Sequence, residues 1–211
     1  MAYPAELFHF GKKKHIGDML PDGHLSFGLA AGFVRTGLTS GQNDDEMKRT
    51  AKPSPKTTSI LVGDTAQTAQ PLKNLTAINV GFGIRVPYFM KCFSLGHSEE
   101  MYVEVEGDCC IEVLDVPEFF RRFEEALKAQ LPTWGALTAH AQYWDFSRIP
   151  YGMTQPDLMF LKDAAKYSCQ KEYRIVLLPP EGFVVTGSDM RQSIRLGSLS
   201  DIAKEIAKAT P

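Results

Sequence analysis

The pattern of hydrophobic and polar positions predicts a chain built mostly from short β-strands. Many segments alternate apolar with polar residues, or form brief apolar runs that end at Gly, Pro or Asp. The most apolar strand is expected at 172–178, where EYRIVLL precedes two prolines. The segments 101–105 and 109–114 flank a short polar turn and predict a β-hairpin. Further strands are expected at 5–10, 24–28, 76–86, 86–94, 142–149, 183–186 and 193–196.

A different periodicity predicts one long helix over 115–131. Asp115 and Glu118 have the spacing of a capping box, Pro117 lies in the first turn, and Pro132 follows the last residue. Apolar residues recur every three or four positions, as one buried helix face requires. They are Phe119, Phe120, Phe123, Leu127 and Leu131.

The other expected helices are shorter. One lies within 11–20 and one at about 156–165, and a terminal helix is expected after the cap signal of Ser198 and Asp201. Strands follow strands more often than they alternate with helices, so the predicted fold class is α+β. We expect mixed, mostly antiparallel sheets of short strands with three or four peripheral helices.

The chain is expected to form a single domain over residues 1–211, with a loop-rich excursion at about 32–74. That segment is rich in Gly, Pro, Ser and Thr and shows no strong periodicity. Such a long irregular stretch is uncommon in a compact domain and tends to be functional or mobile.

Composition excludes several classes of protein. The 211 residues include 23 Lys and Arg against 25 Asp and Glu, a net charge of −2, with 44% hydrophobic residues. This balance argues against a broadly basic duplex-DNA binder. No apolar run approaches the roughly 20 residues that span a bilayer, and the N-terminus lacks the regions of a signal peptide. A cytoplasmic protein without membrane contact is therefore expected.

Cysteine and histidine give no sign of a disulfide scaffold or a metal site. The four cysteines show no CxxC spacing, and the vicinal pair Cys109 and Cys110 is difficult to bridge. The five histidines are scattered, without the spacing of a zinc motif. The acidic cluster at 43–46 is expected to form a cap or local salt bridges, and no metal is expected.

Three polar residues stand out because each lies in a predicted strand. His9 lies between aromatics in LFHF, Ser26 lies in LSF, and Glu172 begins the most apolar strand. A carboxylate beside such a strand is a candidate functional group. The alternative is that Glu172 is the solvated first residue of its strand.

Several motifs occur in an order that resembles a widespread family of uncharacterised bacterial proteins, often found among phage-defence and toxin genes. The motifs are LFHF, HLSFGLAAGF, the Asn43–Glu46 cluster, KCFS at 91–94 and KYSCQKEYRIVL at 166–177. The architecture of that family is similar to the ADP-ribosyltransferase fold. The family signature has Glu-x-Glu in the late strand, whereas this chain has Gln170-Lys171-Glu172.

This resemblance implies an enzyme that cleaves nicotinamide adenine dinucleotide (NAD) and transfers ADP-ribose to a protein or nucleic acid, as a toxin or defence effector. Glu172 would be catalytic by stabilising the developing ribosyl cation, and Gln170 would orient the acceptor. His9 would bind the ribose or amide part of NAD, and Ser26 would either support the nicotinamide-side ribose or orient Glu172. An antitoxin or immunity protein would be a further partner.

Some assignments stay open. Arg174 shares the period-two face of Glu172, so it is expected either to bind the NAD pyrophosphate or to form a structural ion pair. Phe27 is expected either to stack on NAD or to belong to the core. Two other functions are considered: a non-catalytic binding or sensor module of the same fold, and a metal-dependent nucleic-acid-processing enzyme that uses the acidic residues 44–46.

Overall fold

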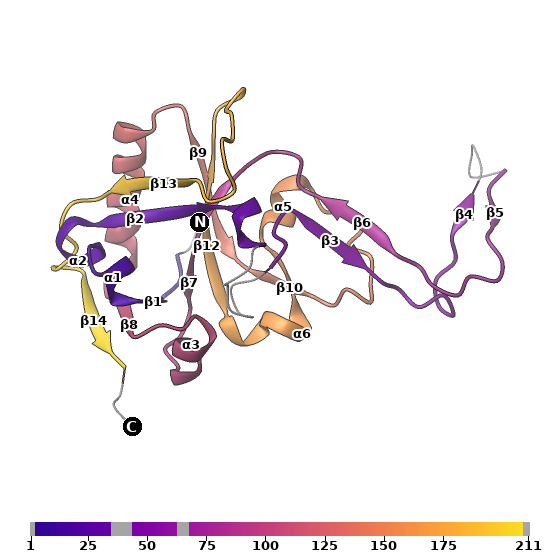
Figure 1. The fold of residues 1–211 in the computed structure, drawn as a ribbon, viewed down its shortest axis with the longest axis horizontal. Helices are drawn as coiled ribbons and strands as arrows, with labels where there is room; N and C mark the ends of the chain where they lie inside the picture. Colours follow the sequence, from indigo (N-terminus) through magenta and orange to yellow (C-terminus); the bar gives the residue numbers. More distant parts are fainter. Residues whose placement is uncertain (1–2, 35–43, 63–67, 209–211) are drawn as a thin grey trace.

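A single antiparallel sheet forms the centre of the molecule (Figure 1). The computed structural model describes residues 3–34, 44–62 and 68–208. The main path of the sheet has the order β13-β2-β7-β1-β8-β14, and β12 and β9 continue from the other edge of β7. The bounds are β1 Leu7–Gly11, β2 His24–Leu29, β7 Phe89–Ser94, β8 Cys109–Val113, β9 Gly135–His140, β12 Glu172–Leu178, β13 Arg191–Arg195 and β14 Ala203–Ala207.

The sheet divides at β7. One edge of β7 pairs with β12 along its length, from Phe89 opposite Leu177 to Ser94 opposite Glu172. The other edge is shared, because β2 pairs with Phe89 whereas β1 pairs with Ser94. The strands β2 and β1 therefore separate, and in Figure 1 the β2–β13 pair crosses the direction of β7 and β12.

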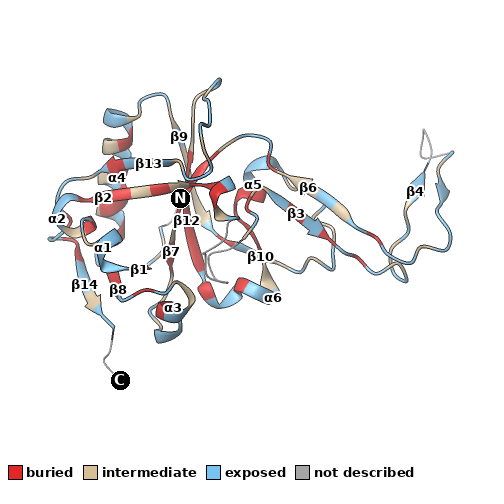
Figure 2. Cartoon of the chain, in the orientation of Figure 1, coloured by how far each residue is buried: buried red, intermediate tan, exposed pale blue. Residues whose placement is uncertain are grey.

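The long helix α4 (Val116–Gln130) covers one face of the sheet. The side chain of Asp115 accepts a hydrogen bond from the backbone N–H of Glu118, so the predicted helix start is confirmed. Phe120 packs on Tyr173 of β12, with ring centroids 5.9 Å apart. Burial of each large apolar side chain contributes about 1.5–3 kcal/mol, and Figure 2 shows buried positions where α4 meets the sheet.

Shorter elements cover the opposite face of β7 and β12. The helix α5 (Gln155–Met159) begins with a capping box formed by Thr154 and Asp157. The strands β10 (Gln142–Trp144) and β11 (Leu161–Asp163) form a small parallel pair beside it. Two further helices, α6 (Ala164–Tyr167) and the 3₁₀ helix η2 (Ser168–Gln170), lead into β12.

The predicted excursion at 32–74 contains strands. The pair β3 (Lys48–Ala51) and β6 (Val80–Gly83) is followed outward by the small hairpin of β4 (Leu61–Val62) and β5 (Gln70–Pro71). In Figure 1 these strands form an arm that extends away from the central sheet. The part of the excursion at 35–43 and 63–67 lies outside the described residues.

The predicted hairpin over 101–114 is wrong. Residues Glu99–Glu104 form helix α3, which follows Ser98 and has two glutamates in its first turn. Tyr102 of α3 packs edge-on against Phe10 of β1, with centroids 5.0 Å apart. With its expected partner helical, β8 pairs instead with β1 and β14.

The predicted terminal helix is also wrong, because Ala203–Ala207 form strand β14 on the edge of β8. The cap signal marks a turn, in which Ile202 N–H donates to the carbonyl of Leu199, and Asp201 pairs with Arg122 of α4. Five residue pairs with β8 replace the expected helix.

The remaining differences concern the bounds of some elements, the number of helices, and two strands. The strand expected at 142–149 ends at Trp144, and no strand forms at 183–186. The helix expected at 156–165 ends at Met159, and β9 was not expected from the sequence pattern. The described residues form six α-helices rather than three or four, but five of them have six residues or fewer, among them α1 (Lys13–Ile16) and α2 (Met19–Asp22). Among the described helices, none is long and apolar enough to cross a membrane.

A buried charge cluster as the candidate functional site

The candidate catalytic residue Glu172 lies in a buried cluster of six charged side chains. Three carboxylates and three cations form it, so their formal charges balance, and five of the six side chains are at most 9% exposed. The turn before β3, β3 itself, β11 and β12 contribute the residues. They are Asp44, Glu46, Arg49, Lys162, Glu172 and Arg174.

Both carboxylate oxygens of Glu172 are occupied by cations. Lys162 Nζ donates to Glu172 Oε1 at 2.5 Å, and Arg174 Nε donates to Glu172 Oε2 at 2.8 Å. The backbone N–H of Glu172 donates to the hydroxyl of Tyr143 at 2.8 Å. The side chain of Glu172 is 9% exposed, so its position is fixed by partners on two neighbouring elements and one side chain of its own strand.

Arg174 links β12 to the turn before β3. Its Nη1 and Nη2 donate to the two carboxylate oxygens of Glu46 at 2.8 and 2.9 Å. Nη1 also donates to the carbonyl of Met159 at 2.8 Å. Such a two-pronged guanidinium–carboxylate contact is the stronger kind of ion pair. The sequence left two roles open for Arg174, and the structure shows it in ion pairs at full burial.

Arg49 completes the cluster on the side of the arm. It donates to Glu46 Oε2 at 2.9 Å and to Asp44 at 3.2 Å. The expectation of local salt bridges at 43–46 is therefore confirmed for Asp44 and Glu46. Asp45 instead accepts from the backbone N–H of Lys48 at 2.9 Å, as a turn residue does.

Gln170 reaches the cluster through Lys162. Its Oε1 accepts from Lys162 Nζ at 2.6 Å, so one ammonium holds both Gln170 and Glu172. The two residues do not alternate along one strand, because Gln170 ends η2 and Lys171 has a left-handed backbone with φ of 43°. The same ammonium lies 4.4 Å from the ring centroid of Tyr167.

The surroundings keep the Glu172 carboxylate ionised. Burial raises its pKa, but the charges of Arg174 and Lys162 and their hydrogen bonds outweigh burial and lower the pKa to about 2. Asp44 shows the opposite balance, since burial and the nearby Glu46 raise its pKa to about 6. Both carboxylates are therefore mostly ionised at neutral pH, and Asp44 takes up a proton at a higher pH than Glu172 does.

The other predicted site residues lie elsewhere. Opposed residues of paired strands share a face of the sheet, so the register places Glu172 with Ser94 and Phe8 on one face, and His9 on the other. His9 Nε2 lies 2.7 Å from Lys91 Nζ, and its Nδ1 lies 3.1 Å from the carbonyl of Cys92.

Ser26 and Phe27 lie on β2. Ser26 Oγ accepts from Arg191 of the neighbouring strand β13 at 3.4 Å, with no bond to the charge cluster among those of the described residues. Phe27 is fully buried, and its ring centroid lies 6.2 Å from that of Phe123 in α4. The structure therefore brings together Gln170, Glu172 and Arg174, but not His9, Ser26 or Phe27.

Sequence reasoning missed Lys162 and Lys91. Lys162 lies in β11, where KD follows an apolar run, and no pattern along the chain marks it as a partner of Glu172. Lys91 lies between apolar residues in the strand FMKCFS, and this pattern could have marked it as a buried lysine. Burial lowers its pKa to about 7.

Each carboxylate of the cluster is paired with a lysine or arginine side chain. Within the described ranges, no group of three His, Cys, Asp or Glu side chains could hold a metal ion. Asp44 and Glu46 are both bound to Arg49, and a cation entering there would have to displace it.

No protein-family model, curated protein or solved structure matches this chain.

Proposed function

We propose that this chain is a binding module in which the buried charge cluster stabilises the fold and does not catalyse a reaction. The observation that carries the proposal is that Lys162 and Arg174 occupy both oxygens of Glu172. A carboxylate that stabilises a ribosyl cation needs an oxygen facing the sugar and a net negative field. The cluster offers neither. Both oxygens of Glu172 are bound to cations, and the formal charges of the six side chains balance.

Removing one partner of a buried ion pair leaves an uncompensated charge, so the cluster is expected to matter mainly for stability.

The proposed function is tested by incubating the purified protein with NAD, following nicotinamide release, and measuring NAD binding by calorimetry. We expect neither signal from the wild type. Nicotinamide release by the wild type that disappears in a folded Glu172→Gln variant would overturn the proposal.

A second candidate function is ADP-ribosyl transfer from NAD. Two observations favour it: Gln170 and Glu172 meet on one ammonium, and the low pKa of Glu172 keeps it ionised. In this reaction the bond between nicotinamide and ribose breaks, nicotinamide leaves with the bonding electrons, and an acceptor nucleophile attacks the ribose carbon and releases its proton to solvent. Lys162 would have to leave Glu172 when NAD binds.

The two candidates differ in what an acceptor would show. A transferase would label a protein or nucleic acid in a lysate with ADP-ribose from tagged NAD, and the label would require Glu172. A binding module would leave the lysate unlabelled, with or without Glu172. Folding of the Glu172→Gln variant must be verified by circular dichroism before either result is interpreted.

A further inference from the structure

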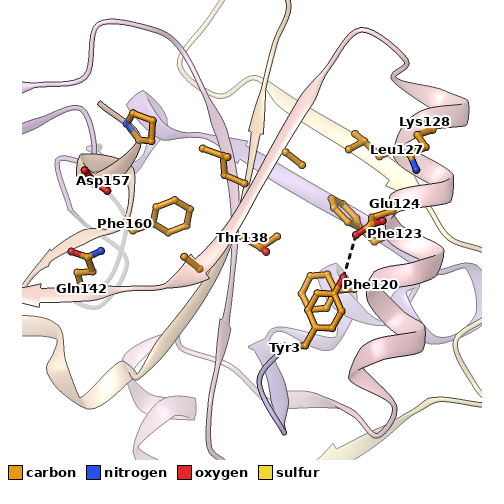
Figure 3. A pocket seen from close by; sticks show the side chains of 14 residues that line it. Tyr3, Phe120, Phe123, Glu124, Leu127, Lys128, Thr138, Gln142, Asp157 and Phe160 are labelled. Carbon is orange, nitrogen blue, oxygen red and sulfur yellow. Dashed lines mark hydrogen bonds between the residues drawn. The ribbon is translucent and has the colours of Figure 1, made fainter. Parts of the chain in front are cut away.

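The outer edge of β9 lies at the bottom of a groove of about 670 Å³ (Figure 3). One wall is α4, which contributes Phe120, Phe123 and Leu127. On the other side of the strand lie Phe160 and Pro156. In Figure 3 the strand crosses between these two walls, with α4 on one side and Phe160 on the other.

The outer edge of β9 presents backbone hydrogen-bonding groups. Ala141 N–H donates to the carbonyl of Glu172, and along an antiparallel pair such bonded residues alternate with unbonded ones. The register then directs the backbone of Leu137 and Ala139 toward β12 and that of Thr138 outward. Among the strands of the described residues, β9 pairs only with β12.

The three outer strands of the sheet differ in how their edges are protected. Proteins normally protect such edges with charges, proline or a covering group. On β13, the side-chain amide of Gln130 bonds both backbone groups of Arg195, at 2.6 and 3.1 Å. On β14, Lys204 and Glu205 supply charge. The sequence of β9, GALTAH, contains no proline and no Lys, Arg, Asp or Glu.

We propose that the groove along β9 binds an extended segment of a partner protein, which pairs with β9 as an additional strand. Its backbone would bond the outward groups at Thr138, and its side chains would point alternately toward the α4 wall and toward Phe160. Apolar residues are therefore expected at alternate positions of the segment. This inference rests on the proposed function and names the class of its partner.

The shape of the groove argues for a single extended segment rather than a second copy of this chain. The β9 edge of a second copy would also lie between its own α4 and Phe160. Two edges that are both recessed between walls cannot approach to the 4.7–4.9 Å spacing of paired strands. A lone peptide strand has no such walls.

The first experiment pans a random heptapeptide phage library against the wild-type protein. We expect enriched peptides with alternating apolar residues, one of which is then synthesised and its affinity measured by calorimetry. The absence of enrichment, or enriched peptides without alternation that bind elsewhere, would overturn the inference.

The second experiment tests strand pairing directly. N-methylation of the synthetic peptide removes one backbone donor at a time, and affinity should fall at least about tenfold at alternate positions only. The variant Thr138→Pro removes an outward N–H but keeps the inward ladder, and should weaken binding similarly. Thr138→Val is the matched control and should retain binding. Equal affinity for every N-methylated peptide contradicts strand pairing, even if Thr138→Pro fails to fold.

Two further outcomes separate the inference from the proposed function. Light scattering that shows a wild-type dimer, lost in Thr138→Pro, would replace the partner segment by a second copy. Failure of every peptide without any NAD cleavage would overturn the β9 inference alone. NAD cleavage that requires Glu172 would overturn the proposed function and leave the peptide result intact.

Discussion

The charge cluster and strand β9 both adjoin β12, but they differ in how completely their polar groups are paired. Beneath β12, Glu172 and Arg174 meet Lys162 and Glu46 in short hydrogen bonds at nearly full burial. Beside β12, β9 directs the backbone of Thr138 into a groove. Saturated polar groups hold a structure together and offer nothing to a ligand, whereas open ones can bind. This contrast is the reason why we propose the β9 edge, rather than the charge cluster, as the binding site.

The largest expected effect comes from breaking the cluster. Arg174→Met should lower the free energy of unfolding by about 3–5 kcal/mol, because Glu46 and Glu172 would each lose a buried partner. Arg121→Met is the matched control, since Arg121 is 55% exposed in its pairs with Glu118 and Glu125, and it should cost at most about 1 kcal/mol. Urea denaturation measures both. Equal losses would show that the cluster does not stabilise the fold.

A second prediction concerns acid. Glu172 has a folded pKa of about 2, below its ordinary value of 4.5, so its contribution is full above pH 4.5 and is lost as pH falls toward 2. The stability difference between the wild type and Glu172→Gln should therefore shrink between pH 5 and pH 2.5. The raised pKa of Asp44 acts in the opposite direction but is common to both proteins. A difference that does not change with pH contradicts the assignment.

A third prediction uses Lys91, which lies on the opposite face of the sheet with His9. Its folded pKa of about 7 lies below the ordinary 10.5, so the unfolded chain binds more protons between these values, and stability rises with pH there. The rise should reach up to about 1.4 kcal/mol per pH unit and be absent in Lys91→Met. Denaturation at pH 7, 8 and 9 measures it. A wild type and variant with parallel pH profiles would show that Lys91 does not titrate in this range.

The smallest effects distinguish the sheet edges. Gln130→Ala should cost about 1 kcal/mol, because the backbone of Arg195 loses two hydrogen bonds at the β13 edge. Thr138→Val on β9 should change stability by less than about 0.5 kcal/mol. Thermal unfolding compares the two. A larger cost for Thr138→Val would mean that this side chain already has a structural role in the groove.

Local signals predicted the elements that depend on their own residues. The cap at Asp115 and the spacing of Phe119, Phe120 and Phe123 determine α4, and the apolar run at 172–178 determines β12. Residues 101–104 of the expected strand are helical, and Tyr102 packs on Phe10, a contact between residues far apart in the chain. The terminal segment became β14 because β8 offered a free edge. Neither partner is visible in the local pattern.

The candidate site was predictable only in part. The motif at 170–174 brought Gln170, Glu172 and Arg174 to notice, and the structure places all three together. The contact between Arg174 and Glu46 spans 128 residues, and no spacing rule could have found it. His9 and Ser26 resembled parts of one site, but the register of β1 and the split of the sheet at β7 separate them from Glu172.

The sequence by itself determined the α+β class, the capped helix, the apolar strand and the identity of its charged residues, because each follows from neighbours within a few positions. The tertiary structure alone decided that those charges neutralise one another and that β9 keeps an open edge between α4 and Phe160. Pairing depends on which distant segments meet, and burial then determines whether a charged group forms an ion pair or remains available to a ligand.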